Sequence, residues 1–269
     1  MSTKGVYTAL SGAMAQSLKM DTIANNIANS STNGFKRDQQ VFQEYLTNRE
    51  KDPTVVNSPR IPASIDSFYD HQGQDKSFVD LKGTYTDHTQ GGLRSTGANL
   101  DVAIDGDGFF EVFTPKGAQY TRLGSFTLDG NGQLVTKDGY PVMKEGEGDP
   151  AERVIKLQGG KVEIQNNGDI TENGNLVGRL SVVKINDKNT LDKVGNLRFS
   201  FKSNARPEVM SVPNPKLQQG FLESSNVNIV REMTDMIGTT RVFETTQKAI
   251  SAYDQMADKL VNVVPKTNG

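Results

Sequence analysis

The sequence contains no cysteine and no tryptophan, and its 269 residues include only two histidines. The missing cysteines exclude disulfides, thiolate nucleophiles and Cys-ligated zinc. The two histidines, His71 and His88, both lie in a polar stretch, and so small a number argues against a zinc centre. We therefore expect no metal and no cofactor.

The chain also lacks a strong charge of either sign and a long apolar run. It has 30 Lys and Arg against 32 Asp and Glu, a formal net charge of -2, and this balance gives no support for nucleic-acid binding. No apolar run approaches the ~20 residues that span a bilayer, so we expect no direct membrane insertion. The opening "MSTKGVYTALSG" is interrupted by Thr, Ser and Gly, so we expect no cleaved signal peptide.

Patterns that carry catalysis are missing as well. The sequence has no P-loop or Rossmann fingerprint, and no nucleophile with a base stands out. The segments 105–110 and 128–140 are rich in Asp-Gly and Asn-Gly but fail the EF-hand template, since position 6 counted from Asp129 is Leu134. We interpret both as turns between strands. We expect no enzyme and no small-molecule substrate, although plentiful carboxylates leave a carboxylate-only glycosidase open as the third alternative.

Helical periodicity is present at both ends of the chain. Residues 6–27 place apolar side chains at i, i+3, i+4 and i+7, which predicts one amphipathic helix. The turn residues 30–34 end this helix. Its apolar stripe consists of Val6, Leu10, Ala13, Met14, Met20, Ile23, Ala24 and Ile27.

Residues 228–264 predict a second, longer helix. A heptad stripe indicates a helical pair or bundle, and Asn226 or Asn228 is the expected N-cap. Gly238 costs this helix roughly 1 kcal/mol against Ala, which suggests close approach by a neighbouring backbone. The stripe is longer than the N-terminal helix can cover, which indicates contact with other chains. Its positions are Met236, Phe243, Ile250, Ala257 and Val264.

The middle of the chain has the pattern of strands. Short apolar or alternating runs punctuated by Gly, Asn and Asp predict hairpins and an all-β module, and a Pro-containing polar stretch before them predicts an extended or hairpin connector. We therefore expect an α+β fold, with a helical domain formed by the paired N- and C-terminal helices and an inserted all-β domain. The expected segments are 1–42 (N-terminal helix), 43–92 (connector), 93–222 (β-rich outer domain) and 223–269 (C-terminal helix).

Three asparagines near the end of the first helix, Asn25, Asn26 and Asn29, need an explanation. Asn is a poor helix residue, and three of them cost on the order of 2 kcal/mol relative to Ala. Our hypothesis is that they cap the helix end and bind backbone groups of the following chain or of neighbouring subunits, since a satisfied buried amide fixes register.

These residues carry a family resemblance. The segment "YTALSGAMAQSLKMDTIANNIANSSTNGFKR" resembles the N-terminal signature of flagellar rod, hook and hook-associated axial proteins, and "LESSNVNIVREMTDMIGTTRVFETTQKAI" resembles their C-terminal signature. Between them, "NLDVAIDGDGFFEVFTPKGAQYTRLGSFTLDGNGQLVTKDGYPV" is similar to the start of the family's β domain. The resemblance implies a structural subunit of the bacterial flagellar basal-body rod, which transmits motor torque across the periplasm.

The resemblance further implies helical assembly through the terminal helices, with copies of the chain and other rod proteins as partners. It also implies delivery by the flagellar export apparatus. The opening of the chain and its length are most similar to proximal-rod members, and the distal rod is the alternative. A secreted β-rich binding module is the alternative from another class. The expected subunit-interface residues are Leu10, Asn25, Asn26, Ile27, Asn29, Asn33, Gly34, Phe35, Asn226, Asn228, Met233, Met236, Ile237, Phe243 and Ile250.

Overall fold

The two long helices expected from periodicity are both present in a computed structural model of the chain, which describes residues 4–47, 76–146, 148–195, 197–203 and 208–263. Helix α1 runs from Lys4–Ala28 and helix α3 from Ile229–Val263. They pack together, and the strands lie between them in the sequence, so the predicted α+β class is confirmed.

The chain divides into two compact units. One, here the helical unit, consists of Met1–Ala24, Gln39–Thr84 and Met233–Gly269. The other, here the β unit, consists of Asn25–Asp38 and Tyr85–Glu232. The last turn of α1 and the first turn of α3 therefore belong to the β unit. The segment boundaries expected from the sequence stay a prediction.

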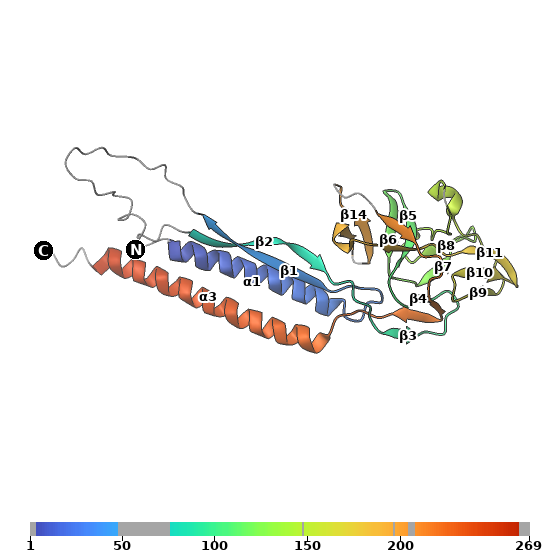
Figure 1. Cartoon of the computed structure of the whole chain (residues 1–269). Helices are drawn as coiled ribbons and strands as arrows, with labels where there is room; N and C mark the ends of the chain where they lie inside the picture. Colours follow the sequence, from blue (N-terminus) through green and yellow to red (C-terminus); the bar gives the residue numbers. More distant parts are fainter. Residues whose placement is uncertain (1–3, 48–75, 147, 196, 204–207, 264–269) are drawn as a thin grey trace, which may run out of the picture. The chain divides into compact units, whose positions relative to one another are not determined.

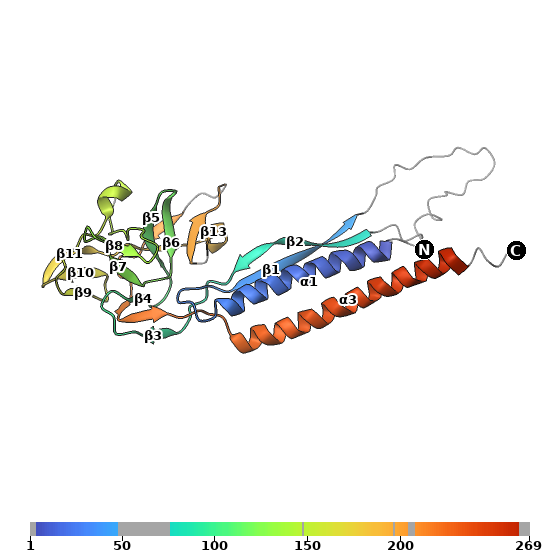
Figure 2. The ribbon, with the colours of Figure 1, turned by 180° about the vertical axis from the view of Figure 1, so that it is seen from behind.

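In the helical unit, α1 and α3 lie side by side and antiparallel (Figure 1). The hydroxyl of Thr240 lies 3.5 Å from the sulfur of Met20, while a Cβ built on Gly5 would lie 3.6 Å from the ring of Tyr253. Because lower numbers on α1 face higher numbers on α3, the helices run in opposite directions, as the reverse view also shows (Figure 2). Neither helix, over its described residues, combines the length and apolarity needed to cross a membrane.

The predicted heptad positions of α3 form its half-buried stripe, with Met236, Phe243 and Ile250 at successive repeats. Beside them, Thr239 is buried and its hydroxyl donates to the carbonyl of Asp235 at 2.8 Å. Three more threonines of α3 bond the carbonyl four residues before them in the same way, so these hydroxyls are satisfied by their own helix. The side chain of Ala257, and all of Val264, lie outside the described residues.

A two-stranded ribbon runs along α1 in the same unit. It consists of β1 (Asp38–Thr47) and β2 (Lys76–Thr86). Gln40 fixes it to the helix, since its Nε2 donates to the carbonyl of Leu18 at 2.8 Å and to the hydroxyl of Thr22 at 2.6 Å. Strand β2 lies within residues 43–92, for which the sequence predicts an extended or hairpin connector, whereas β1 begins before that stretch and ends in it.

The largest sheet of the β unit has six antiparallel strands in the order β13-β14-β6-β5-β12-β15. Its central strand β5 contributes buried side chains to both faces of the sheet. Phe109 packs into one apolar cluster with Tyr120 and Phe199, while Phe110 and Val112 pack into the other. Alternation with period 2 explains this division. The strands are β5 (Phe109–Thr114), β6 (Gly117–Thr121), β12 (Val182–Ile185), β13 (Leu191–Val194), β14 (Arg198–Phe201) and β15 (Val209–Ser211).

Smaller sheets complete the β unit. A three-stranded sheet has the order β11-β10-β9, and three pairs are formed by β7 with β8, β4 with β16 and β3 with β17. Two short 3-10 helices, η1 (Pro150–Arg153) and η2 (Lys188–Thr190), connect strands. The strands are β3 (Leu93–Ser95), β4 (Val102–Ile104), β7 (Phe126–Leu128), β8 (Leu134–Thr136), β9 (Val162–Ile164), β10 (Asp169–Glu172), β11 (Asn175–Arg179), β16 (Leu217–Gln219) and β17 (Phe221–Glu223).

The Asn-Gly and Asp-Gly steps lie in turns, as the sequence predicts. Asn173 and Gly174 both have positive φ, 53° and 84°, and join β10 to β11 in the geometry that two-residue hairpins favour. Between β7 and β8, the carboxylate of Asp129 accepts the backbone N–H groups of Asn131 (2.9 Å) and Gln133 (2.7 Å). This carboxylate closes a turn.

Candidate subunit interface and the terminal clasp

Asn26, in the last turn of α1, is enclosed within the β unit with 1% of its surface exposed. Its Oδ1 accepts the backbone N–H of Asp38 at 3.0 Å, while its Nδ2 donates to the carbonyl of Asp38 at 2.9 Å and to Glu232 Oε2 at 3.2 Å. One side chain thus satisfies both backbone groups of Asp38, as a neighbouring strand would. The unfavourable helix propensity of Asn26 is offset by bonds within its own chain.

The other two asparagines have different surroundings. Asn29 Nδ2 donates to the carbonyl of Asn25 at 2.9 Å, which adds a second hydrogen bond to a carbonyl in the last turn of the helix. The side chain of Asn25 is exposed. Of the three, Asn29 secures the helix end, Asn26 holds the returning chain, and Asn25 presents its amide outward.

Gly34 allows the chain to turn sharply after α1. Its φ is +73°, and a Cβ added there would lie 2.8 Å from the backbone nitrogen of Leu123. Its N–H donates to the carbonyl of Glu223 at 2.7 Å. Both the dihedral angle and the close approach therefore require glycine.

Phe35 and Lys36, the next two residues, are fully enclosed. The ammonium of Lys193 lies 3.9 Å from the centroid of the Phe35 ring, a cation–π contact. Lys36 Nζ lies 2.5 Å from Glu223 Oε1 and donates to the carbonyl of Thr89 at 2.6 Å. Burial lowers the pKa of the Lys36 ammonium, and the adjacent Glu223 carboxylate opposes that shift.

The carboxylate of Glu223 pairs with two cations, Lys36 and Arg122. Its second oxygen lies 3.3 Å from Arg122 Nη1, and its first also accepts the N–H of Gly91 at 2.9 Å. Arg122 in turn donates to the carbonyl of Gly106 at 2.8 Å, and burial lowers the pKa of its guanidinium. Two buried cations thus share one buried carboxylate, and each also donates to one carbonyl oxygen, while the Nε of Arg122 is buried without a partner among the described residues.

A second ion pair joins Arg37 to the start of α3. Arg37 Nε lies 2.5 Å from Glu232 Oε1, and the N–H of Arg37 donates to Asn226 Oδ1 at 2.8 Å. The Nδ2 of Asn226 donates to the carbonyl of Asp87 at 2.9 Å. Asn228 is the N-cap, because its Oδ1 accepts the N–H of Arg231 at 3.1 Å.

These contacts form one polar cluster that lies wholly within the β unit. It joins the segment after α1 to the segment before α3. We call it the terminal clasp. Its members are Asn26, Lys36, Arg37, Arg122, Glu223, Asn226 and Glu232.

The helical unit exposes large apolar side chains on α1. They recur at spacings of three and four residues, so they form one stripe along the helix. Tyr7 and Met14 are the most exposed, at 60% and 61%. We call this set the α1 stripe: Tyr7, Leu10, Met14 and Leu18.

Helix α3 exposes apolar side chains on both flanks of its half-buried stripe. At 100° per residue, one flank holds Met233 and Ile237, and the other holds Val242, Tyr253 and Met256. We call these the α3 flanks. Exposed apolar surface of this extent on two adjacent, antiparallel helices is the usual mark of contact with another chain.

The expected interface residues fall into three groups. Leu10, Asn25, Asn228, Met233 and Ile237 are exposed, whereas Asn26, Gly34 and Phe35 are buried inside their own chain. The others are half-buried: Ile27, Asn29, Asn33, Asn226, Met236, Phe243 and Ile250. The structure thus brings the buried ones into the clasp or beside it, and the exposed ones lie on the surface of the chain.

Sequence reasoning did not select several residues that the structure singles out. Tyr7 and Leu18 extend the spacing of Leu10 and Met14 and could have been found from it. Lys36 and Glu223 had no such signal, because their partners lie more than a hundred positions away.

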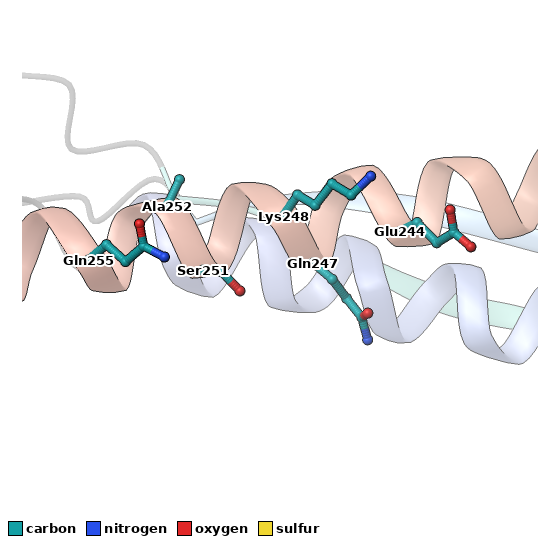
Figure 3. A pocket seen from close by; sticks show the side chains of 6 residues that line it. All are labelled: Glu244, Gln247, Lys248, Ser251, Ala252 and Gln255. Carbon is teal, nitrogen blue, oxygen red and sulfur yellow. The ribbon is translucent and has the colours of Figure 1, made fainter.

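The outer face of α3 carries a hollow of about 440 Å³ (Figure 3). Its described lining comes from successive turns of this one helix, and the polar side chains there also contribute their apolar stems. Without side chains from a second described element, the hollow is a shallow groove on the surface. Its lining residues are Glu244, Gln247, Lys248, Ser251, Ala252 and Gln255.

Comparison with known proteins finds family matches at the two ends and in the middle of the chain. Residues 6–36 match the flagella basal body rod protein family, residues 103–176 match the flagellar hook protein FlgE/F/G D1 domain, and residues 218–263 match the flagellar basal body rod FlgEFG protein C-terminal family. The FlgG rod protein of Buchnera aphidicola (subsp. Acyrthosiphon pisum) is 35% identical, over 95% of this chain and 97% of that protein.

The chain belongs to the flagellar basal-body rod FlgEFG family. FlgG of Bacillus subtilis is 33% identical over 97% of this chain and 98% of its own, and FlgF of Rhizobium meliloti is 35% identical over 97% of each. Rod proteins of this family are structural and not enzymes, so the family membership decides against the enzyme and binding-module alternatives.

The terminal clasp connects the two rod signatures. The N-terminal match, residues 6–36, contains Asn26 and Lys36, while the C-terminal match, residues 218–263, contains Glu223, Asn226 and Glu232. Two of these residues bond across directly, Asn26 to Glu232 and Lys36 to Glu223, while Asn226 bonds the backbone of Arg37, one residue beyond the N-terminal match. In this chain, the two signatures are therefore parts of one structure.

Proposed function

We propose that this rod-family subunit assembles helically through the α1 stripe and the α3 flanks. The observation that carries the proposal is that both sets of apolar side chains are exposed in the single chain. They lie on different helices, so a contact between them joins unlike surfaces. Unlike surfaces repeat without closing, which produces a helical stack and not a closed dimer.

Many modest contacts suffice for such a stack. Fully burying one large apolar side chain contributes about 1.5–3 kcal/mol, and each subunit offers several. Because every subunit binds neighbours at more than one surface, the contacts reinforce one another. This strength suits a shaft that transmits torque from the motor across the periplasm. Copies of this chain and adjoining rod proteins are the proposed partners, and the flagellar export apparatus is the proposed route.

Met14→Lys tests the proposal, because Met14 lies mid-way along the α1 stripe and is largely exposed. The lysine places a charge in the contact without touching the core of the chain. We expect unchanged thermal unfolding of the purified subunit, loss of swimming, and rods that stop at this subunit. The matched control is Lys19→Ala, an exposed α1 residue outside the stripe, which should swim normally. A Met14→Lys strain with complete rods would refute the proposed interface.

Within the rod, we assign the subunit to the proximal tier. The segment "KGVYTALSGAMAQ" and the similarity to FlgF of Rhizobium meliloti over 97% of each chain support this tier. The distal tier is the second candidate, since FlgG of Bacillus subtilis and of Buchnera aphidicola match over the same span. Imaging basal bodies from a strain that lacks this chain separates the two. The proximal assignment requires that the proximal segment itself be incomplete, whereas a complete proximal segment that lacks only the distal one would refute it.

A further inference from the structure

His88 sits in an aromatic cluster of the β unit and has no role in the contacts described so far. Its ring lies edge-on to Phe109, with centroids 5.7 Å apart, and to Phe199, 5.1 Å apart. Its Nδ1 is buried and has no hydrogen-bond partner among the described residues. Because Nδ1 has no such hydrogen-bond partner and the ring packs against two phenyl rings, these surroundings favour the neutral form of the imidazole.

Charged groups around the His88 ring also favour its neutral form. Lys188 of η2, Lys36 after α1 and Arg122 after β6 all oppose a positive charge on His88, while Asp87 favours one. Lys188 is itself paired with Asp107 at 2.9 Å, and Lys36 and Arg122 share Glu223. Burial first, and these cations second, lower the pKa of His88 to about 4.

The segment that carries His88 is also part of the terminal clasp region. The N–H of Asp87 donates to the carbonyl of Arg37 at 2.8 Å, and the carbonyl of Thr89 accepts Lys36 Nζ at 2.6 Å. The N–H of Gly91 donates to Glu223 at 2.9 Å. A protonated imidazole needs water or an acceptor at Nδ1, which is buried without one among the described residues, while these three bonds hold the backbone around His88 in place.

We propose that His88 is an acid-sensitive latch: when its imidazole gains a proton, segment 87–91 leaves the terminal clasp and uncovers the Lys36–Glu223–Arg122 pairings. The device belongs to the folded subunit alone and does not depend on its assembly. It would make the junction between the two terminal signatures firm at neutral pH and loose in acid.

Amide hydrogen exchange tests the latch on the full chain. If the open state has the ordinary His pKa of 6.5 and the closed state a pKa of about 4, the opening equilibrium rises about twentyfold between pH 7 and pH 5. We expect protection factors of the Asp87 and Gly91 amides to fall by that factor. His88→Phe keeps an aromatic ring but cannot take a proton, and its protection factors should change less than threefold. His71→Gln, which removes the other histidine, should behave like the parent chain.

Equal loss of protection in the parent chain and in His88→Phe would overturn the proposal, because a group other than His88 would then open the segment. Should His88→Phe not fold, an NMR titration of the His71→Gln chain decides, since His88 is then the only histidine. The proposal requires that the ring signals of His88 and the amide signal of Gly91 shift together, with a midpoint near pH 4. A ring that titrates near 6.5 while the Gly91 signal stays unchanged would equally overturn it.

Discussion

Lys36 and Glu223 are 187 residues apart in the sequence, yet their charged groups meet at 2.5 Å with both side chains enclosed. Glu223 also neutralises Arg122, so a single carboxylate balances two buried cations. Removing a charge from such a group leaves its partners unpaired in a medium that solvates them poorly.

Glu223→Gln should therefore destabilise the subunit strongly. The amide keeps the shape of the carboxylate but leaves Lys36 and Arg122 without a counter-charge, at a cost of about 3–5 kcal/mol. Urea unfolding followed by circular dichroism measures the loss. Glu163→Gln is the matched control, because its ion pair with Lys161 is exposed, and we expect it to unfold like the parent chain.

Asn26→Ala and Asn25→Ala should separate folding from assembly. Asn26→Ala leaves the backbone groups of Asp38 unsatisfied in a buried place, so the free energy of unfolding should fall by about 2–3 kcal/mol. Asn25→Ala removes only an exposed amide from a helix, so the isolated subunit should be as stable as the parent or slightly more so. Thermal unfolding measures both effects.

Motility assays on the same strains complete this test. If Asn25 contacts a neighbouring subunit, Asn25→Ala should impair swimming despite a stable monomer, and Asn29→Ala should do so to a lesser degree. Normal swimming and full-length rods in Asn25→Ala would remove Asn25 from the proposed interface.

Gly34→Ala should destabilise the β unit through the backbone. The added methyl group must accept a φ of +73° and also displace the backbone of Leu123, and we expect a loss of about 2 kcal/mol or more. Gly12→Ala is the control, for which we expect the opposite change in the free energy of unfolding. Gly12 lies within α1 and no described atom is within 4 Å of its added Cβ, so the substitution should stabilise the chain by about 0.5–1 kcal/mol. Chemical denaturation of both variants gives the comparison.

Tyr120 should make the subunit sensitive to alkali. Burial raises the pKa of its phenol to about 12, above the usual 10, so the folded chain keeps a proton that the unfolded chain gives up. The stabilisation is full below pH 10 and is lost as the pH rises towards 12, by at most about 3 kcal/mol. Tyr120→Phe should lose less stability over this range, measured by urea unfolding at pH 9 and pH 11.5. Parallel curves for the two chains would show that other groups cause the alkaline loss.

The helices could be predicted from the sequence because their information is local. A period near 3.6 predicted residues 6–27 and 228–264, and the structure has Lys4–Ala28 and Ile229–Val263. Turn chemistry was equally local, as Asn173-Gly174 shows. The pairing of β14 with β6 and of β16 with β4 could not be predicted, because no periodic pattern specifies which distant strands become neighbours.

The clasp could not be predicted for the same reason. Asn26 stood out as a poor helix residue, which pointed to a hydrogen-bonding role, but nothing local identified Asp38 and Glu232 as its partners. Glu232 lies in the first turn of α3, and its carboxylate bonds Asn26 and Arg37. Gly238 was expected to admit a neighbouring backbone, and no described atom of its own chain lies within 4 Å of an added Cβ. A partner helix at Gly238 stays a prediction.

The distance along the chain between the members of the clasp also bears on how the protein acquires its structure. A ribosome completes Lys36 long before it reaches Glu223, and closing a loop of that length carries a large entropic cost. High contact order slows folding, so the junction of the two ends must be among the last events, after the intervening strands have shortened the effective loop. A nascent chain of this protein therefore stays incompletely folded at its beginning until nearly all of its sequence has been synthesised.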